Sequence, residues 1–436
     1  MKRFIISFLS SFVIYLSLFV LVVWLIPQKD IKEQTKNSAE YLNDLELFPN
    51  IKDGMFNTKQ DNYADSILLN ILYYLDLSEP IISILESRYY RDFELEVNEN
   101  LLKAVSVNPT SNLEYSRYWH GSIVIIRPLL ILMNIKQIRS LLFFTVVIIL
   151  AICIALLFKI KKMKGYAWCL LVGCIVIKIW MLAYSLEYVM SFLIMSVTLL
   201  AVLINHSYKN KEDITSSIFV VAGVSTCFVD FLTTETLPFT VPMLTLIILS
   251  SKDGTFISCS SSLKKVIKYG IEFGLSYTLM FLAKWLLGAL FLGSNILKDA
   301  LSSVMERTVG EVHIGQTSLS PRITTFQKIS GAIWRNIGCL YPFKNSISLK
   351  MVVLIFIITC LFIFSFIYLF HINYYLELGL VIGFISLIPI LRFLILSNHS
   401  YIHYFFTYRS LLVFVIGILY YIWICCKGYF IRRSDD

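Results

Sequence analysis

The sequence predicts an all-α protein, a polytopic bundle of about ten transmembrane helices with two long extracytoplasmic loops that contain interfacial helices. Three observations support this fold class. Hydrophobic residues make up 57% of the 436 residues and charged residues only 15%, which is far outside the composition of soluble domains. Apolar runs long enough to cross a bilayer recur along the chain. Lys and Arg gather in the short connections between these runs, as they do beside transmembrane helices.

The first apolar run begins directly after Lys2 and Arg3, where a signal peptide would also begin. It is about 23 residues long and ends at Pro27 without the small residues of a cleavage site, so we expect a retained helix. The predicted spans cover residues 4–26, 138–158, 166–185, 187–205, 215–231, 236–250, 267–292, 349–370, 375–397 and 411–426.

Basic residues fall on alternate connections and set the expected orientation. They are Lys2 and Arg3, Lys159 to Lys164, Lys209 and Lys211, Lys252 to Lys268, and Lys427 to Arg433. We assign this side to the cytosol, which gives a multi-pass protein of the cell membrane with both termini cytoplasmic. These blocks also account for the excess of 38 basic over 29 acidic residues, so the expected partner is the lipid bilayer and not nucleic acid.

This orientation divides the chain into five segments: the first transmembrane helix, 1–26; an extracytoplasmic loop with helical and re-entrant segments, 27–137; a transmembrane bundle, 138–292; an extracytoplasmic loop with amphipathic helices, 293–348; and C-terminal transmembrane helices with a short cytosolic tail, 349–436. In the fourth segment, apolar residues recur at helical spacing from Ile296 to Val309, which predicts a helix in the interface. In the second, the apolar stretches 67–74 and 81–85 predict that the loop docks on the bundle.

The first external loop carries the strongest candidate for a catalytic site, the acidic pair Asp61 and Asp65. On a helix these residues would share one face, where two like charges repel and a proton or a cation would relieve them. Such a pair suits a general base or a site for a divalent cation. A divalent cation is the one cofactor that the sequence suggests. The alternative is that Asp61 is a helix N-cap and Asp65 a solvated carboxylate of the first turn.

Arg117, His120 and Arg127 follow in the same loop, next to aromatic residues and an apolar stretch too short to span cleanly. They either anchor the loop at the membrane interface or face a substrate. The shorter external turns add Glu187, Asp230, His399 and His403 as candidate substrate contacts. His399 and His403 are four residues apart, but without a third ligand at fixed spacing they favour hydrogen bonding or phosphate contact over a metal site.

Ionisable residues inside predicted spans are stronger evidence for a functional site, because a charge at that depth is costly and usually faces a cavity or a partner. In the predicted orientation, five cations lie near the outer leaflet: Arg127, Lys178, Lys284, Arg392 and Arg409. Snorkelling to the surface would explain any one of them. Their coincidence is better explained by a bound anionic group such as a lipid-linked phosphate.

The order of these elements resembles the GT-C superfamily of membrane glycosyltransferases, with a first helix, a long acidic external loop, a bundle of spans and a further external loop with interfacial helices. The resemblance implies transfer of a sugar from an outer-leaflet polyprenyl-phosphate donor to a cell-surface glycan, lipid or polymer. It implies that Asp61 or Asp65 accepts the proton of the acceptor, and that Lys284, Arg392 or Arg409 holds the donor phosphate. The chain departs from the D-x-D or E-x-D pattern of that family, since three residues separate its two acids.

Two further classes of function remain open. A transporter or flippase of a lipid-linked or anionic substrate would line a passage with the intramembrane cations, although the chain has no inverted repeat or paired broken helices. A non-catalytic assembly partner would leave Asp61 and Asp65 freely replaceable. The segments 118–121 and 398–403 also look like those of uncharacterised multi-pass membrane proteins of Gram-positive bacteria, a resemblance that names no activity.

Overall fold

The computed structural model describes residues 2–51, 57–208, 212–230, 232–252, 258–293, 295–310, 323–341 and 373–435. Within these ranges the protein is all-α and has no β-strand, as the apolar pattern predicts. The predicted span 349–370 lies outside the described residues.

Seven stretches of helix in the described residues are long and apolar enough to cross a membrane. Five of them are whole helices: α1 (Lys2–Leu25), α7 (Ile135–Lys159), α9 (Leu186–Ser207), α10 (Glu212–Val229) and α12 (Cys259–Leu292). The other two are Leu376–Ile395, within α16 (Asn373–Ile395), and Tyr404–Cys426, which ends within α19 (Leu412–Asp435). By length and composition, these stretches indicate a membrane protein with several spans.

Two of the predicted spans form helices that are too short for this criterion. The first, α8 (Lys164–Val176), has 13 residues and is followed at Lys178 by a left-handed backbone, with φ 58°, and then by the 3₁₀ helix η1 (Ile179–Tyr184). The second, α11 (Leu237–Lys252), has 16 residues. The break at Lys178 was not predicted. It divides the apolar run 166–185 into two pieces that have different hydrogen-bonding patterns.

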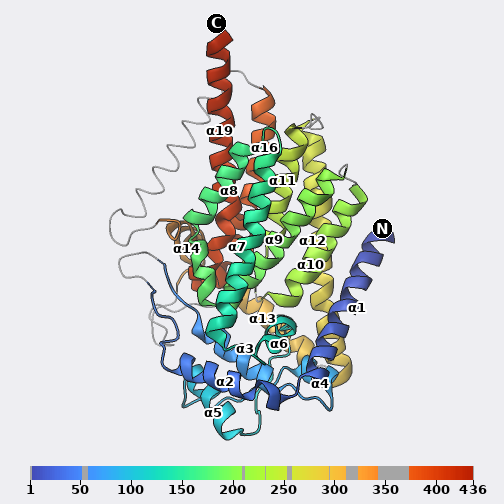
Figure 1. Cartoon of the computed structure of the whole chain (residues 1–436), viewed down its shortest axis with the longest axis vertical. Coiled ribbons are helices and arrows are strands. Elements are labelled where there is room, and N and C mark those ends of the chain that lie inside the picture. Colours follow the sequence, from blue (N-terminus) through green and yellow to red (C-terminus); the bar gives the residue numbers. More distant parts are fainter. Residues whose placement is uncertain are drawn as a thin grey trace.

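A layer of short helices covers one end of the bundle (Figure 1). Its first part follows α1 and consists of α2 (Gln28–Asn43), α3 (Asn62–Tyr74), α4 (Pro80–Glu86), α5 (Val97–Val107) and α6 (Ile123–Leu129). Its second part is a group of helices that pack against one another: α13 (Asn295–Val309), α14 (Thr325–Gly338), α17 (Ser397–Ile402), α18 (Tyr404–Thr407) and the 3₁₀ helix η2 (Tyr408–Leu411). The C-terminus points away from this layer, and Arg3 near the N-terminus pairs with Asp213 at the start of α10.

The first part of this layer is docked on the bundle, as its apolar stretches predict. Leu69, Ile71 and Leu72 of α3 are fully buried, and so is Ile84 of α4. All four belong to the same hydrophobic core as the long helices. The α3 helix begins where the Asp61 side chain accepts a hydrogen bond from the backbone N–H of Ala64, which is the expected geometry of an N-cap.

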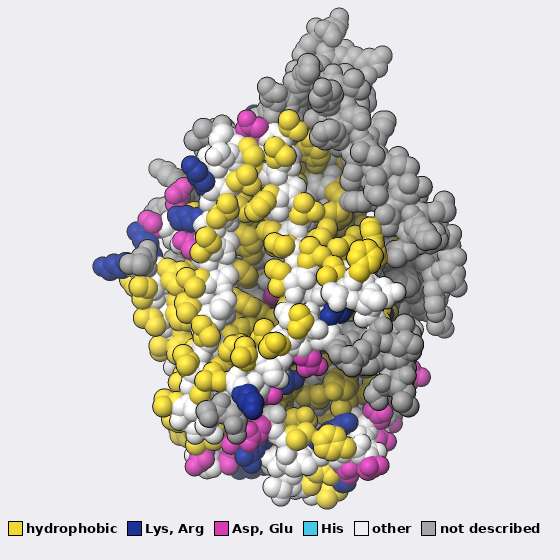
Figure 2. Space-filling view, turned by 180° about the vertical axis from the view of Figure 1, so that it is seen from behind, with side chains coloured by type: hydrophobic (Ala, Val, Ile, Leu, Met, Phe, Trp, Pro, Cys, Tyr) yellow, Lys and Arg dark blue, Asp and Glu magenta, His cyan; other side chains and the backbone are white. Residues whose placement is uncertain are grey.

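The outer surface of the long helices is apolar. Figure 2 shows hydrophobic side chains spread over this surface, with charged side chains mainly toward the two ends. Leu286 and Leu290 of α12 are 61% and 77% exposed, which would be costly in water and is favourable in lipid. The α13 helix also exposes Leu301 and Met305, as expected for a helix in the membrane interface.

Candidate functional site

A pocket of about 380 Å³ lies where the layer of short helices meets the bundle. It opens between the start of α3, the loop before α6, the first turn of α9, the end of α13, and α17 with the residues after it. Its charged and polar lining residues include Asp61, Glu187, Glu306, Arg117, Arg307, His120, Asn398, His399 and His403. Tyr63, Tyr115, Tyr118 and Phe406 contribute aromatic walls.

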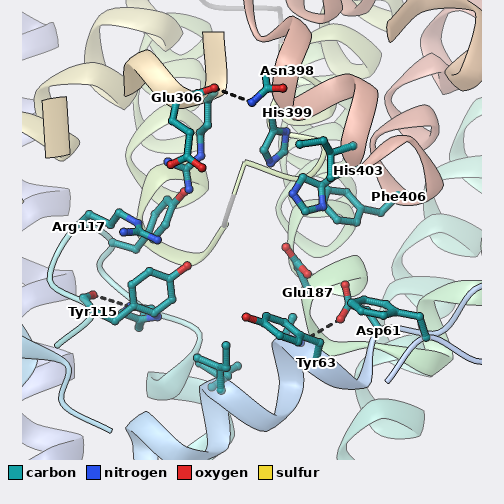
Figure 3. A pocket seen from close by; sticks show the side chains of 18 residues that line it. Asp61, Tyr63, Tyr115, Arg117, Glu187, Glu306, Asn398, His399, His403 and Phe406 are labelled. Carbon is teal, nitrogen blue, oxygen red and sulfur yellow. Dashed lines mark hydrogen bonds between the residues drawn. The ribbon is translucent and has the colours of Figure 1, made fainter. Parts of the chain in front are cut away.

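Two carboxyl groups form one wall of the pocket. Asp61 is 3% exposed and Glu187 is 9% exposed, and Figure 3 shows both on the same side of the space, with Arg117 and Glu306 across from them. Asp61 comes from the N-cap of α3 and Glu187 from the first turn of α9. Two elements distant in sequence therefore bring their acids to one place.

The protonation of Asp61 is set by its surroundings. Burial raises the pKa of this carboxyl to about 7, and the nearby charge of Asp65 raises it further, against the lowering effects of the Ala64 N–H and Arg139. A carboxyl group that titrates near neutral pH exchanges protons readily under physiological conditions, which suits a general base. The bonded Ala64 N–H fixes the orientation of the carboxyl.

Two arginines on the other side of the pocket carry spare hydrogen-bond donors. The Nε atoms of Arg117 and Arg307 are buried and have no hydrogen-bond partner. Arg117 stacks on the Tyr115 ring, 4.5 Å from its centroid, and its nearest carboxylate is Asp299 at 3.8 Å. Arg307 lies over the Tyr118 ring at 5.4 Å. Aromatic stacking thus holds both guanidinium groups at the pocket while leaving N–H groups available for a ligand.

Three histidines line the pocket in the neutral form. Burial lowers the pKa of His120 to about 3 and that of His403 to about 4, and it lowers the pKa of His399 well below its usual value. The His120 Nε2 atom donates to the carbonyl of Tyr115 at 3.0 Å, and the rings of His399 and His403 stand 4.7 Å apart. These imidazoles therefore offer hydrogen bonds to a ligand rather than positive charge.

Asp65 differs from the prediction that pairs it with Asp61. It is fully buried and forms an ion pair with Arg139 of α7 at 2.7 Å, and it accepts hydrogen bonds from Ser185 Oγ and the Leu186 N–H. It is neither solvated nor part of the pocket lining. Arg139 supplies the positive charge that was expected from a cation between the two aspartates. Through its contacts with Arg139, Ser185 and Leu186, Asp65 joins α3 to α7 and α9.

Arg127, Lys178 and Lys284, expected to converge on an anion, instead bind carbonyl groups at helix ends. Arg127 donates to Ile26 O, just after α1, and to Leu72 O in the last turn of α3. Lys284 Nζ donates to Ile84 O and Leu85 O at the end of α4, at 2.7 and 3.0 Å, and Lys178 Nζ donates to Cys339 O at the end of α14, at 2.6 Å. Helix C-termini carry partial negative charge and unpaired carbonyls, which stabilise buried cations.

The other predicted residues also lie outside the pocket lining. Arg392 forms an ion pair with Glu235 at 2.7 Å, and Asp230 accepts hydrogen bonds from Ser191 and Thr233. Arg409 lies 4.1 Å from the ring of Tyr188, which follows Glu187 in the chain. Its Nη1 donates to Phe405 O, and its Nε and Nη2 are buried without a hydrogen-bond partner. Of the thirteen predicted residues, the pocket brings together Asp61, Glu187, Arg117, His120, His399 and His403.

Sequence reasoning did not select Glu306 and Arg307 as site residues. They stand near the end of α13, on the polar face of a helix whose pattern indicates only an interfacial position. Within the described residues, no group of three or more His, Cys, Asp or Glu side chains is placed to hold a metal ion.

No protein-family model matches this chain, and no curated protein or solved structure matches it either.

Proposed function

We propose that this protein is a membrane glycosyltransferase of the GT-C type, which transfers a sugar from a polyprenyl-phosphate donor to a cell-surface glycan, lipid or polymer. The proposal depends on one observation, that Arg117 and Arg307 lie across the pocket from Asp61. Sugar transfer from a lipid phosphate needs a base for the acceptor and positive charge for the leaving phosphate, and these two requirements meet there.

The proposed reaction is a single displacement. The acceptor hydroxyl gives its proton to the Asp61 carboxylate while its oxygen forms a bond to the anomeric carbon of the sugar. The bond from that carbon to the phosphate oxygen breaks, and the lipid phosphate leaves with the bonding electrons. The free Nε–H groups of Arg117 and Arg307 bind the phosphate, with phosphate binding supported by charge-assisted hydrogen bonds. This assignment replaces Lys284 and Arg392, whose donors are directed at protein groups. It also replaces Arg409, which does not line the pocket although its Nε and Nη2 atoms are buried without a hydrogen-bond partner.

Phosphate binding can be tested without knowing the sugar. The probe is a labelled polyprenyl monophosphate, titrated into purified protein in lipid nanodiscs. We expect Arg117→Gln and Arg307→Gln each to weaken binding about tenfold or more, because each removes a charged donor to phosphate. Arg88→Gln is the matched control, since Arg88 is partly exposed and paired with Glu86 and Glu114.

Unchanged binding in both pocket variants would defeat the assignment. Accumulation of a labelled lipid-linked oligosaccharide in the opposite leaflet of proteoliposomes, without sugar transfer, would favour the flippase function. Normal surface glycans in cells with Asp61→Asn and full protein levels would favour a non-catalytic assembly role.

The proposed function also requires the pocket to face the outside, with about ten spans in all and both termini in the cytosol. Cys339 cannot report this orientation with a thiol reagent because it is fully buried. Phe93, in the layer of short helices, is 76% exposed, and Tyr208, just after α9, is 71% exposed. In intact cells we expect the new thiol of Phe93→Cys to react with a membrane-impermeant thiol reagent. The new thiol of Tyr208→Cys should react only after the membrane is permeabilised. The reverse pattern would invert the topology.

A further inference from the structure

We propose that Glu235 and Arg392 are positioning residues that hold His399 as a neutral imidazole protonated at Nε2, so that it presents an N–H donor to the pocket. The use of that donor on a phosphate oxygen rests on the proposed function. The tautomer itself does not.

Arg392 is held in place by contacts from both sides. Its Nε donates to Glu235 Oε1 at 2.7 Å, its Nη1 to Ser400 Oγ at 2.9 Å and its Nη2 to Leu232 O at 2.6 Å. These partners come from the connection between α10 and α11 and from α17, while Arg392 itself stands near the end of α16. With its side chain 7% exposed, the guanidinium has a fixed orientation.

The backbone at Leu232 indicates that this contact is specified by the fold. Leu232 has φ 66°, a left-handed conformation that is unfavourable by about 1 kcal/mol for a residue with a side chain. Its carbonyl accepts the shortest of the hydrogen bonds from Arg392. Strained backbone of this kind persists where surrounding contacts require it.

The guanidinium determines where the His399 proton lies. Arg392 Nη2 approaches His399 Nδ1 at 3.4 Å. Arginine has no acceptor, so Nδ1 must be the unprotonated nitrogen and the ring proton must lie on Nε2. His399 lines the pocket, and its neighbours Arg392, His403 and Arg307 all disfavour a charged imidazole.

The test is the protonation state of His399, read from the ¹⁵N spectrum of histidine-labelled protein in lipid bilayers. The chain has only six histidines, so a His399→Gln difference spectrum assigns the signal. In the wild type at pH 7 we expect one neutral form with a protonated Nε2. In Arg392→Met we expect both tautomers, and the ring to gain its second proton at a pH about one unit higher or more.

Glu235→Gln is the gentler second variant, because it keeps the shape of the partner while removing its charge, and we expect it to admit a second tautomer. Arg335→Met is the control: Arg335 of α14 donates to the nearby Tyr401 carbonyl and should leave the His399 signal unchanged. A wild-type His399 that is protonated at Nδ1 or doubly protonated at pH 7 overturns the proposal. An identical tautomer in folded Arg392→Met also overturns it.

These outcomes are independent of the proposed function, since the spectrum needs neither donor nor acceptor. If the tautomer is as expected and polyprenyl phosphate does not bind, the proposed function fails and the positioning role stands. If polyprenyl phosphate binds through Arg117 and Arg307 while His399 carries its proton on Nδ1, the positioning role fails alone.

Discussion

Asp61 and Asp65 stand one helical turn apart at the start of α3, yet they belong to two different regions of the molecule. Asp65 lies in the joint between α3, α7 and α9, where Arg139 neutralises it and neighbouring groups satisfy its oxygens. Asp61 lies at the pocket, where burial raises its pKa to about 7. The joint uses charge to fix a contact, whereas the pocket keeps a carboxyl group that can exchange its proton.

The basic residues divide in the same way. Lys284 and Arg127 direct their donors at carbonyl groups of helix ends. Arg117 and Arg307 leave a buried N–H without a partner at the pocket. A buried charge is therefore not by itself evidence for a ligand. The informative feature is a buried donor that is left unpaired beside the pocket. Arg409 also has two buried donors without a partner, Nε and Nη2, but it does not line the pocket.

The largest expected effect on stability comes from a substitution in the joint between α3, α7 and α9. Arg139→Met leaves the fully buried Asp65 without its counter-charge, which should lower the free energy of unfolding by about 3–5 kcal/mol. Thermal unfolding in detergent and the amount of protein in membranes measure this loss. Lys136→Met on the exposed side of the same helix is the control. A normal melting temperature for Arg139→Met would show that the ion pair does not hold the joint.

Lys284→Met should have a smaller effect on stability. It removes the donor for two carbonyl groups at the end of α4, a loss of about 1–3 kcal/mol. Lys268→Met, at an exposed position of the same α12 helix, should change little. Binding of polyprenyl monophosphate per folded molecule should stay near the wild-type value. A stable Lys284→Met protein with weakened binding would return Lys284 to the phosphate site.

The pH dependence of the proposed sugar transfer follows from the pKa of Asp61, which is about 7. A general base must be deprotonated, so the rate should be constant at alkaline pH and fall as the pH drops through 7, approaching tenfold per pH unit. Transfer by membranes or proteoliposomes between pH 5 and 9 measures this profile. A flat profile down to pH 5 would show that Asp61 is not the titrating base.

Asp61→Asn should have the smallest effect on folding. Asn is as good an N-cap as Asp, and it removes a carboxyl group whose folded-state pKa is raised. Such a group binds more protons in the folded state, so its contribution to stability falls as the pH rises from about 4 to 7. At pH 8 we therefore expect Asp61→Asn to melt at the wild-type temperature or slightly above it. Marked destabilisation would mean that Asp61 holds the fold as Asp65 does.

Composition and periodicity predicted the membrane class and the positions of the described apolar helices, because both depend on local sequence. The sequence also singled out Asp61 as a candidate residue, and Asp61 lines the pocket. It could not reveal that Arg139, 74 residues away, neutralises Asp65, or that Lys284 binds carbonyls 199 and 200 positions earlier in the chain. Partners of buried charges are set by the tertiary fold, and backbone carbonyls leave no trace in the sequence.

We propose that Asp61 takes part in the reaction, whereas Asp65 holds the structure together. The most direct measurement compares Asp61→Asn with Asp65→Asn in cells, as surface glycan or glycolipid product divided by the amount of folded protein in membranes. We expect Asp61→Asn to be present at the wild-type level and to lose about a hundredfold or more of its output per molecule, the loss expected for a general base. Asp65→Asn should be less abundant, with output per folded molecule close to that of the wild type. Equal output per molecule from Asp61→Asn and the wild type, or a selective loss in Asp65→Asn, would contradict the account.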